Sequence, residues 1–293
     1  MHYAFFEPQL LKQLSAKLSQ QKNKPGLYLV ATPIGNIFDI SLRALQILND
    51  VDIIFAEDTR NSRILLNVYN IQKPLIACHE FNEADDTVVS KIKADKKYAL
   101  ISDAGTPGIS DPGYRLVNWC IEHDINVIPI PGACAFITGL SASGMPTDSF
   151  TFYGFIPPKE NARLEFFNSI KSRKEVSIFL ESPKRIIAFL NDAITILGNR
   201  KCCACRELTK LHETFYRGTI SKLIDFFNKN EPIGEFVIIL NGNNQNEQIT
   251  DEEIESHLRE LIKTHSIKDA VKIISDTYDL SKKDVYKKAL EIK

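Results

Sequence analysis

The sequence KYALISDAGTPGISDPG (97–113) decides the fold, because a strand-like apolar run leads directly into a loop of unusual composition. KYALISDAG (97–105) has the length and apolar content of a buried strand. DAGTPGISDPG (103–113) then places three glycines and two prolines in eleven residues. Glycine lets the backbone approach a ligand closely or adopt a positive φ, and proline stiffens the rest of a loop. We therefore predict a strand whose carboxyl end carries a ligand-binding loop.

The same alternation of strand, loop and helix extends to both sides of this segment. The other strands predicted in the first half are GLYLVA (26–31), VDIIFAED (51–58) and NVIPIPG (126–132). Helices are predicted after the plausible caps Asp39 and Ser41, and in the apolar run that follows Pro131. Strands that alternate with helices predict a mostly parallel sheet with helices on its faces, which is an α/β fold. The loops TPIGN and DAGTPGISDPG then share the edge at which open α/β sheets bind ligands.

The second half is richer in strands than in helices. Its predicted helices are 184–197 and 221–229, and its predicted strands are SFTFYGFIP, EVSIFLES, KCCACREL, TFYRGTI and EFVIILN. This ratio predicts a mixed sheet in a second α/β domain. We expect a first domain at 25–148, the second at 149–242 and a linker at 243–249, because NGNNQNEQ lacks apolar periodicity.

Both ends of the chain carry helical patterns of their own. Residues 1–24 place leucines at helical spacing with lysines between them, which predicts an amphipathic extension, with a basic RNA-contacting arm as the alternative. Residues 250–293 contain three pairs that fit the S/T-x-x-D/E capping pattern: Thr250/Glu253, Ser266/Asp269 and Ser281/Asp284. Apolar residues at helical spacing follow each pair, so we predict a C-terminal three-helix domain, too small to be stable alone. The four lysines around its last helix form either a solvated face or a phosphate-binding surface.

Composition limits the possible function classes. The 36 basic and 37 acidic residues give a net charge of −1, which excludes nucleic-acid binding by bulk charge and leaves only local patches. We expect no membrane span and no secretory signal, and hence a cytoplasmic protein. Six cysteines in 293 residues do not make a disulfide framework. CCAC (202–205) suits a buried strand better than a metal site, so no metal is expected.

Four common catalytic patterns are absent from the sequence: G-x-G-x-x-G, the P-loop, H-E-x-x-H and G-x-S-x-G. Functions that depend on nicotinamide cofactors, on nucleoside triphosphates, on zinc hydrolysis or on a serine nucleophile therefore lose support. The residues by themselves leave the ligand of the glycine-rich loop open.

A family resemblance rests on seven motifs that occur in one order. They are TPIGN (32–36), AEDTR (56–60), SDAGTPGISDPG (102–113), PGACA (131–135), SGMPTDSFTFYGF (143–155), ESPKR (181–185) and RELTKLHETFYRGT (206–219). Together they strongly resemble the small-subunit ribosomal RNA cytidine 2′-O-methyltransferases of the tetrapyrrole-methylase superfamily, over about 26–242. Phe81 departs from the pattern, because the family commonly has histidine there.

The resemblance implies two α/β domains with S-adenosylmethionine in the cleft between them, usually in a homodimer. It also implies 16S ribosomal RNA of the small subunit as the substrate, with a cytidine 2′-hydroxyl as the methyl acceptor. Carried over by motif, the cofactor-binding residues would be Thr32, Pro33, Asp103, Ala104, Gly105, Ser110, Asp111, Ser141, Ala142 and Glu181.

The hydroxyl is a poor nucleophile, so a proton acceptor is expected among the polar clusters beside the strand ends. The catalytic candidates are Glu57, Asp58, Arg60, His79 and Glu181. Arg60, Lys184 and Arg185 are expected to contact RNA; the last two open a helix and oppose its dipole, which suits a polyanion partner. Asp58 and Arg60 have a plainer alternative, an ion pair that only fixes a loop.

Two other functions stay open. A protein of the same fold could methylate a tetrapyrrole or a translation-factor side chain, and a non-catalytic protein could bind RNA or the ribosome. The basic ESPKR segment and the C-terminal helices favour RNA, because a small acidic macrocycle needs no such extension.

Overall fold

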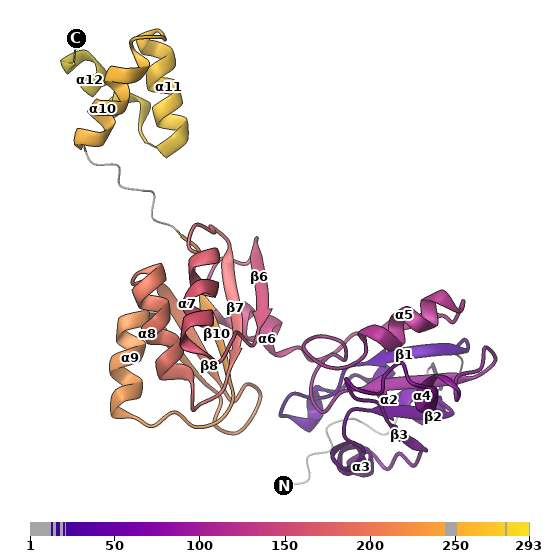
Figure 1. Ribbon diagram of the computed structural model, residues 1–293. Helices are drawn as coiled ribbons and strands as arrows, with labels where there is room; N and C mark the ends of the chain where they lie inside the picture. Colours follow the sequence, from indigo (N-terminus) through magenta and orange to yellow (C-terminus); the bar gives the residue numbers. More distant parts are fainter. Residues whose placement is uncertain are drawn as a thin grey trace.

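The structure, a computed structural model, describes residues 22–243, 251–278 and 280–292, together with Gln13, Ala16, Lys17 and Gln20. Along the chain come two β-sheets, each with its helices, and then a small helical bundle (Figure 1). The leucines of the predicted N-terminal helix and the predicted cap Thr250 lie outside the described residues. Within the described ranges, no helix combines the length and the apolar character needed to span a membrane.

The first half forms a parallel sheet of five strands, which confirms the predicted α/β fold. Its strands, in the order β3-β2-β4-β1-β5, are β1 (Gly26–Val30), β2 (Ile53–Ala56), β3 (Leu75–Ala77), β4 (Lys97–Ile101) and β5 (Val127–Ile130). β3 was not predicted, because three residues are too few to show a pattern. Since the strands all run in one direction, their carboxyl ends and the loops that follow meet at one edge.

Helices cover both faces of this sheet, because consecutive strand residues point to opposite sides. In β2, Ile54 packs in one cluster with residues of α2 (Leu42–Asp50) and α3 (Thr59–Val68), after the short 3-10 helix η1 (Ile37–Asp39). Its neighbour Phe55 packs on the other side, in a cluster with residues of α4 (Asp86–Val89) and α5 (Tyr114–Glu122). Of the two predicted caps, Ser41 caps α2: its Oγ accepts a hydrogen bond from Ala44 N at 3.1 Å.

The second half forms the predicted mixed sheet, in the order β6-β7-β10-β8-β9. Its strands are β6 (Phe150–Gly154), β7 (Val176–Glu181), β8 (Lys201–Arg206), β9 (Thr214–Thr219) and β10 (Phe236–Leu240). β6 runs parallel to β7, and the other pairs are antiparallel. The helices that pack on this sheet are α6 (Ala135–Ser143), α7 (Glu160–Ser169), α8 (Ile186–Leu197) and α9 (Ile220–Lys229). α7 was not predicted, and α6 was predicted as part of the first domain, 25–148, but packs on the second sheet.

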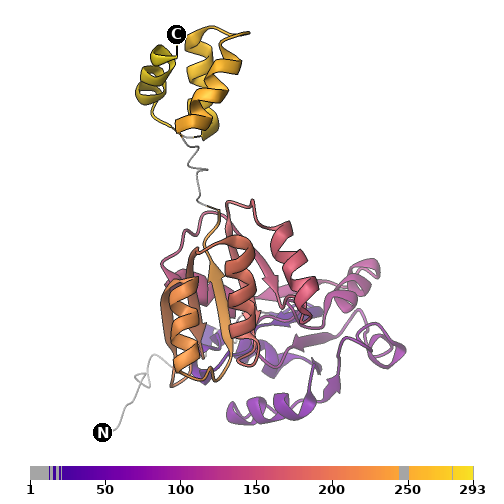
Figure 2. The same cartoon turned by 60° about the vertical axis from the view of Figure 1, so that its left-hand side comes forward.

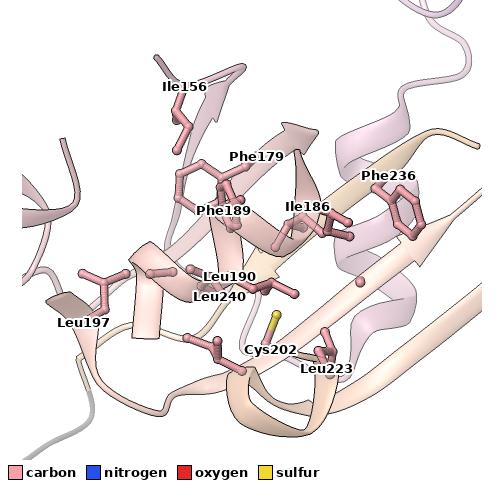
Figure 3. Packing of buried hydrophobic residues seen from close by; sticks show 14 of the residues in the cluster. Ile156, Phe179, Ile186, Phe189, Leu190, Leu197, Cys202, Leu223, Phe236 and Leu240 are labelled. Atoms are coloured by element: carbon pink, nitrogen blue, oxygen red, sulfur yellow. The ribbon is translucent and has the colours of Figure 1, made fainter. Parts of the chain in front are cut away.

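The main core of the second sheet lies between its strands and α7, α8 and α9 (Figure 3). Phe179 of β7 and Phe189 of α8 meet there, with ring centroids 5.2 Å apart. Figure 2 shows this side, with the salmon helix α8 and the orange helix α9 in front of the strands. The opposite face packs on α6, where Leu140 joins a cluster with Val237 and Ile239. Cys202, Cys203 and Cys205 of β8 are buried in the two cores, as predicted for small apolar side chains.

The C-terminal helices α10 (Asp251–Leu261), α11 (Ile267–Tyr278) and α12 (Lys282–Glu291) enclose a core of their own. The predicted cap of α11 is confirmed: Asp269 N donates to Ser266 Oγ at 3.2 Å, and Ser266 Oγ donates to Asp269 Oδ2 at 2.6 Å. Ser281 is the N-cap residue of α12, as predicted, but the capping hydrogen bond expected from its hydroxyl is not formed. The Asp284 N–H donates to the Ser281 carbonyl at 3.0 Å.

Candidate active site between the two sheets

A short antiparallel bridge joins the glycine-rich loop to the loop after β1. Thr32 N donates to Gly105 O at 2.8 Å, and Gly105 N donates to Thr32 O at 3.1 Å. Gly105 has φ = +82°, a conformation that strains other residues. The buried Thr32 hydroxyl also donates to Ser102 O at 3.2 Å. The two loops therefore form one connected edge above the carboxyl ends of β1 and β4.

A buried carboxylate that the sequence did not single out holds the far end of the loop. Glu83 Oε2 accepts a hydrogen bond of 2.5 Å from Gly113 N, the cap residue of α5. This bond fixes where the loop ends and the helix begins. No sequence pattern marks Glu83 for this role, because glutamates are mostly exposed and are rarely buried in this way.

A cleft of about 410 Å³ lies between the two sheets. Loop 104–111 and the start of α6 form one wall, and the ends of β7, β8 and β10 form the other. The two halves touch beside it: a Cβ on Gly154, at the end of β6, would lie 2.9 Å from Ser110 Oγ. They are also tied by a hydrogen bond of 3.1 Å from Asn36 N to Thr209 Oγ1. The cleft is thus built from loops of both halves.

Five of the ten residues expected to bind a cofactor line this cleft: Ala104, Gly105, Ser110, Asp111 and Glu181. They come from the glycine-rich loop and from the end of β7, on opposite walls. The glycine-rich loop therefore supplies residues of one wall, and ESPKR supplies part of the other.

The other five are not among the residues that line the cleft. Thr32 and Pro33 are buried, and Thr32 holds the loops together as described above. Asp103 is exposed, and its Oδ2 accepts a hydrogen bond of 2.8 Å from Asn61. Ser141 and Ala142 lie in the last turn of α6, where Arg217 donates to the Ala142 carbonyl.

The sequence did not point to the apolar surface of the cleft. Phe136 of α6 and Phe152 of β6 stack with ring centroids 4.2 Å apart, and Leu180 and Val237 continue that wall. In the sequence these residues resemble ordinary core positions. They line a cleft because loop 104–111 of the first half faces this apolar surface of the second half.

The Glu181 carboxylate is engaged by its own turn. It is buried; Arg185 Nε donates to Oε1 at 2.6 Å and Arg185 Nη2 donates to Oε2 at 3.0 Å. Ser182 N also donates to Oε1, at 2.7 Å. Arg185 was expected to contact RNA, but its guanidinium binds the Glu181 carboxylate. This pair fixes the turn whose residues Ser182 and Pro183 line the cleft. Lys184, between them, is exposed.

Asp111 stands where the cleft meets a second cavity. It lines the 410 Å³ cleft and also a cavity of about 750 Å³ in the first half. Burial, opposed by a hydrogen bond from Ser102 and aided by the charges of Glu57 and Asp103, raises the pKa of Asp111 to about 6. Asp111 is therefore a better proton acceptor at neutral pH than an ordinary carboxylate.

The remaining catalytic candidates divide into two groups. Glu57 and His79 line the second cavity with Asp111. Asp58 and Arg60 form the ion pair of the plainer alternative, with Arg60 Nη2 2.7 Å from Asp58 Oδ2. The Arg60 guanidinium lowers the pKa of Asp58 to about 2, yet 87% of the Arg60 side chain stays exposed. In the part of the chain that is described, no cluster of histidine, cysteine or acidic side chains could hold a metal ion.

Comparisons with known proteins agree with this architecture. Residues 26–224 match the tetrapyrrole (corrin/porphyrin) methylases, and residues 248–293 match the RsmI C-terminal HTH domain. In fold, the chain is similar to the cobalamin biosynthetic enzyme cobalt precorrin-4 methyltransferase, with a TM-score of 0.53 at 14% identity, covering 73% of this chain and 94% of that one.

Curated relatives are closer in sequence, and several are called ribosomal RNA small subunit methyltransferase I. The protein from Synechocystis is 41% identical over 91% of this chain and 98% of its own length. The protein from Escherichia coli O157:H7 is 38% identical over 93% and 97%. The protein from Thermotoga maritima is 44% identical over 218 residues, which are 74% of this chain and 98% of its own. The chain therefore belongs to the tetrapyrrole methylases and, within them, to the family of ribosomal RNA small subunit methyltransferase I.

Proposed function

We propose that this methyltransferase transfers the methyl group of S-adenosylmethionine to the ribose 2′-hydroxyl of a cytidine in 16S ribosomal RNA. Its family and the names of its relatives support ribosomal RNA of the small subunit as the substrate. The observation that carries the proposal is the cleft between the sheets, with the glycine-rich loop on one wall.

The cleft suits this cofactor in size and chemistry. Its volume falls within the range of roughly 300–1,000 Å³ that is usual for small-molecule sites. Phe136 and Phe152 offer apolar surface for an adenine ring, and the backbone at Ala104 and Gly105 offers hydrogen-bonding groups. When bound there, the cofactor supplies an electrophilic methyl group on a sulfonium.

The residues of the chain would orient the acceptor and remove its proton. The Asp111 carboxylate, at the junction of the two cavities, would accept the proton of the 2′-hydroxyl. Glu57 and His79 are the alternative acceptors at the same edge. Glu181 would act as a positioning residue, because Arg185 and Ser182 engage both of its oxygens. Holding the hydroxyl in line with the methyl group would itself supply much of the rate.

RNA phosphates would be held by exposed cations around this edge. Lys184 and Arg60 are the candidates near the two loops, and Arg60 retains donors beyond its pair with Asp58. Lys283 and Lys287 are exposed on α12 of the C-terminal bundle. Such contacts supply most of the affinity for RNA.

The test is methyl transfer from labelled S-adenosylmethionine to small ribosomal subunits and to free 16S RNA, both lacking the modification. We expect one ribose-methylated cytidine, seen as a single position resistant to alkaline cleavage. Asp111→Ala should abolish transfer, and Asp148→Ala, an exposed aspartate outside both cavities, should leave it unchanged. Transfer to a base, or to a tetrapyrrole but not to RNA, would contradict the proposal.

We extend the proposal to the assembly and its location: a homodimer, as the family resemblance implies, that acts in the cytoplasm. Light scattering during gel filtration tests the first part, with a mass of about twice 33.2 kDa expected. A mass near 33.2 kDa at micromolar concentration would contradict it.

A further inference from the structure

The second cavity, about 750 Å³ in volume, has no part in holding the cofactor as proposed above. Its walls come from the loops after β2 and β3 and from the loop that leads into α5. It shares two lining residues with the cofactor cleft, Ser110 and Asp111. A group seated in it would therefore lie next to the point of methyl transfer.

Two aromatic side chains on the wall of this cavity are strongly exposed. Phe81 is 84% exposed and Tyr114 is 71% exposed. Among the ring contacts of the described residues, Phe81 takes part in one, an edge contact with His79 whose ring centroids are 6.2 Å apart. Exposed rings in a cavity offer flat faces for stacking, and unstacked nucleobases are held on such rings.

The charge in the cavity favours a base over a phosphate. Glu57 and Glu80 line it together with the partly buried Asp111, and these carboxylates would repel a phosphodiester. A carboxylate accepts a hydrogen bond from the exocyclic amino group of cytosine. Arg115 lies on the same wall; its side chain is 64% exposed, and its Nε is 4.0 Å from Glu83 Oε1. Its exposed guanidinium offers a binding position for a phosphate at the rim of the cavity.

We propose that this cavity binds the base of the target nucleotide, splayed out of the RNA, with Phe81 and Tyr114 stacking on it and a carboxylate, Glu80 first, accepting its exocyclic amino group. The ribose of that nucleotide then lies between the two cavities, at Ser110 and Asp111. The inference rests on the proposed function, because it gives the acceptor nucleotide its site.

Stacking is tested with Phe81→Ala and Tyr114→Ala, singly and together. Both side chains are largely exposed, so their loss should leave the fold intact. We expect the double variant to lose about 10-fold or more in kcat/KM for the RNA substrate, since each lost stack costs a factor of this order. The affinity for S-adenosylhomocysteine, measured by calorimetry, should stay within about 2-fold of the wild-type value. Tyr114→Phe keeps the aromatic ring and should retain the wild-type activity. Phe38→Ala removes an 81% exposed phenylalanine outside both cavities and is the matched control.

Recognition of the amino group is tested with RNA that carries uridine in place of the target cytidine. The wild type should prefer cytidine by about 10-fold or more, and Glu80→Gln should reduce that preference. Full kcat/KM in the double aromatic variant, or a preference independent of Glu80, would overturn this inference while the wild type still methylates RNA. A wild type that binds S-adenosylhomocysteine but methylates no RNA would overturn the proposed function and the inference together.

Discussion

Asp111 is a partly buried carboxylic acid that lines both cavities. It must stay polar between two cavities, yet it is partly buried and faces Glu57 and Asp103, so its pKa rises from 3.8 to about 6. The native state therefore favours the neutral acid, and ionising it on folding costs stability. This cost is absent below about pH 4 and fully present above about pH 6, because the folded-state pKa lies above the unfolded value.

Asp111→Asn should consequently stabilise the protein at pH 8 and leave it unchanged at pH 4. After allowance for partial exposure to solvent, we expect about 1–2 kcal/mol at pH 8. Thermal unfolding of both proteins at the two pH values measures the difference. An equal shift at both pH values would mean that the charge is not the cause.

The pair of Glu181 and Arg185 makes a second prediction at the scale of residues. Arg185→Met leaves a buried carboxylate without its cation, and the loss should be about 2–3 kcal/mol in the free energy of unfolding. Arg173→Met breaks an exposed pair with Glu175 and should lower the free energy of unfolding far less than Arg185→Met does. Urea unfolding compares the two. Similar losses would show that Arg185 adds nothing beyond a surface contact.

At the scale of elements, the close approach of β6 to the glycine-rich loop should be intolerant of a side chain. Gly154 has φ = +62°, and an added Cβ would lie 2.9 Å from Ser110 Oγ. Gly154→Ala should therefore cost about 1 kcal/mol or more in stability and also weaken S-adenosylhomocysteine binding, because Ser110 lines the cleft.

Gly198→Ala is the matched control for this substitution. Gly198 has φ = +79°, but no atom lies within 4 Å of its added Cβ. It should lose stability from backbone strain alone and bind the ligand as the wild type does. Unfolding and calorimetry on both variants give the comparison, and equal binding in the two would refute a role of the close approach.

The elements that sequence analysis missed have identifiable physical reasons. β3 is only three residues long, and α7 buries the charged Arg163, which breaks its apolar pattern. Arg163 is tolerated there because Nε donates to Asp192 Oδ2 at 2.7 Å, a partner 29 positions away in the sequence. Long apolar strands such as β4 and β10 carried their own signal. Pairings between residues that are far apart in the sequence leave no local pattern, because they exist only once the chain has folded.

The residues of the candidate site likewise divide into those that a local sequence pattern predicts and those that it does not. The glycine-rich loop was predictable, because its residue types are needed for its backbone conformation, as at Gly105. The apolar wall around Phe136 and Phe152 was not, because any core would use such residues. Glu83 was missed because its role depends on Gly113, which lies 30 positions further on.

At the scale of the whole molecule, each half has cores of its own, and the cleft depends on how the halves meet. The C-terminal bundle has a separate core, around Leu258 and Ile274. The Thermotoga maritima relative aligns over 218 residues, which are 98% of its own length and 74% of this chain. A member of this family can therefore be about a quarter shorter than this chain. We predict that the bundle serves contact with RNA.

Removal of 249–293 should accordingly leave the cofactor cleft working and impair the use of RNA. No residue of that range lines the cleft among those that the structure describes, so the affinity for S-adenosylhomocysteine should stay within about 2-fold. The KM for the ribosomal substrate should rise about 10-fold or more, and rate measurements between 50 and 200 mM salt should show a shallower salt dependence, because fewer phosphate contacts remain. The variant Lys283→Gln/Lys287→Gln keeps the bundle and should show part of this effect. Equal losses in cofactor affinity and RNA methylation would instead make the bundle a structural support for the two sheets, since a surface that only binds phosphate has no reason to change the cleft.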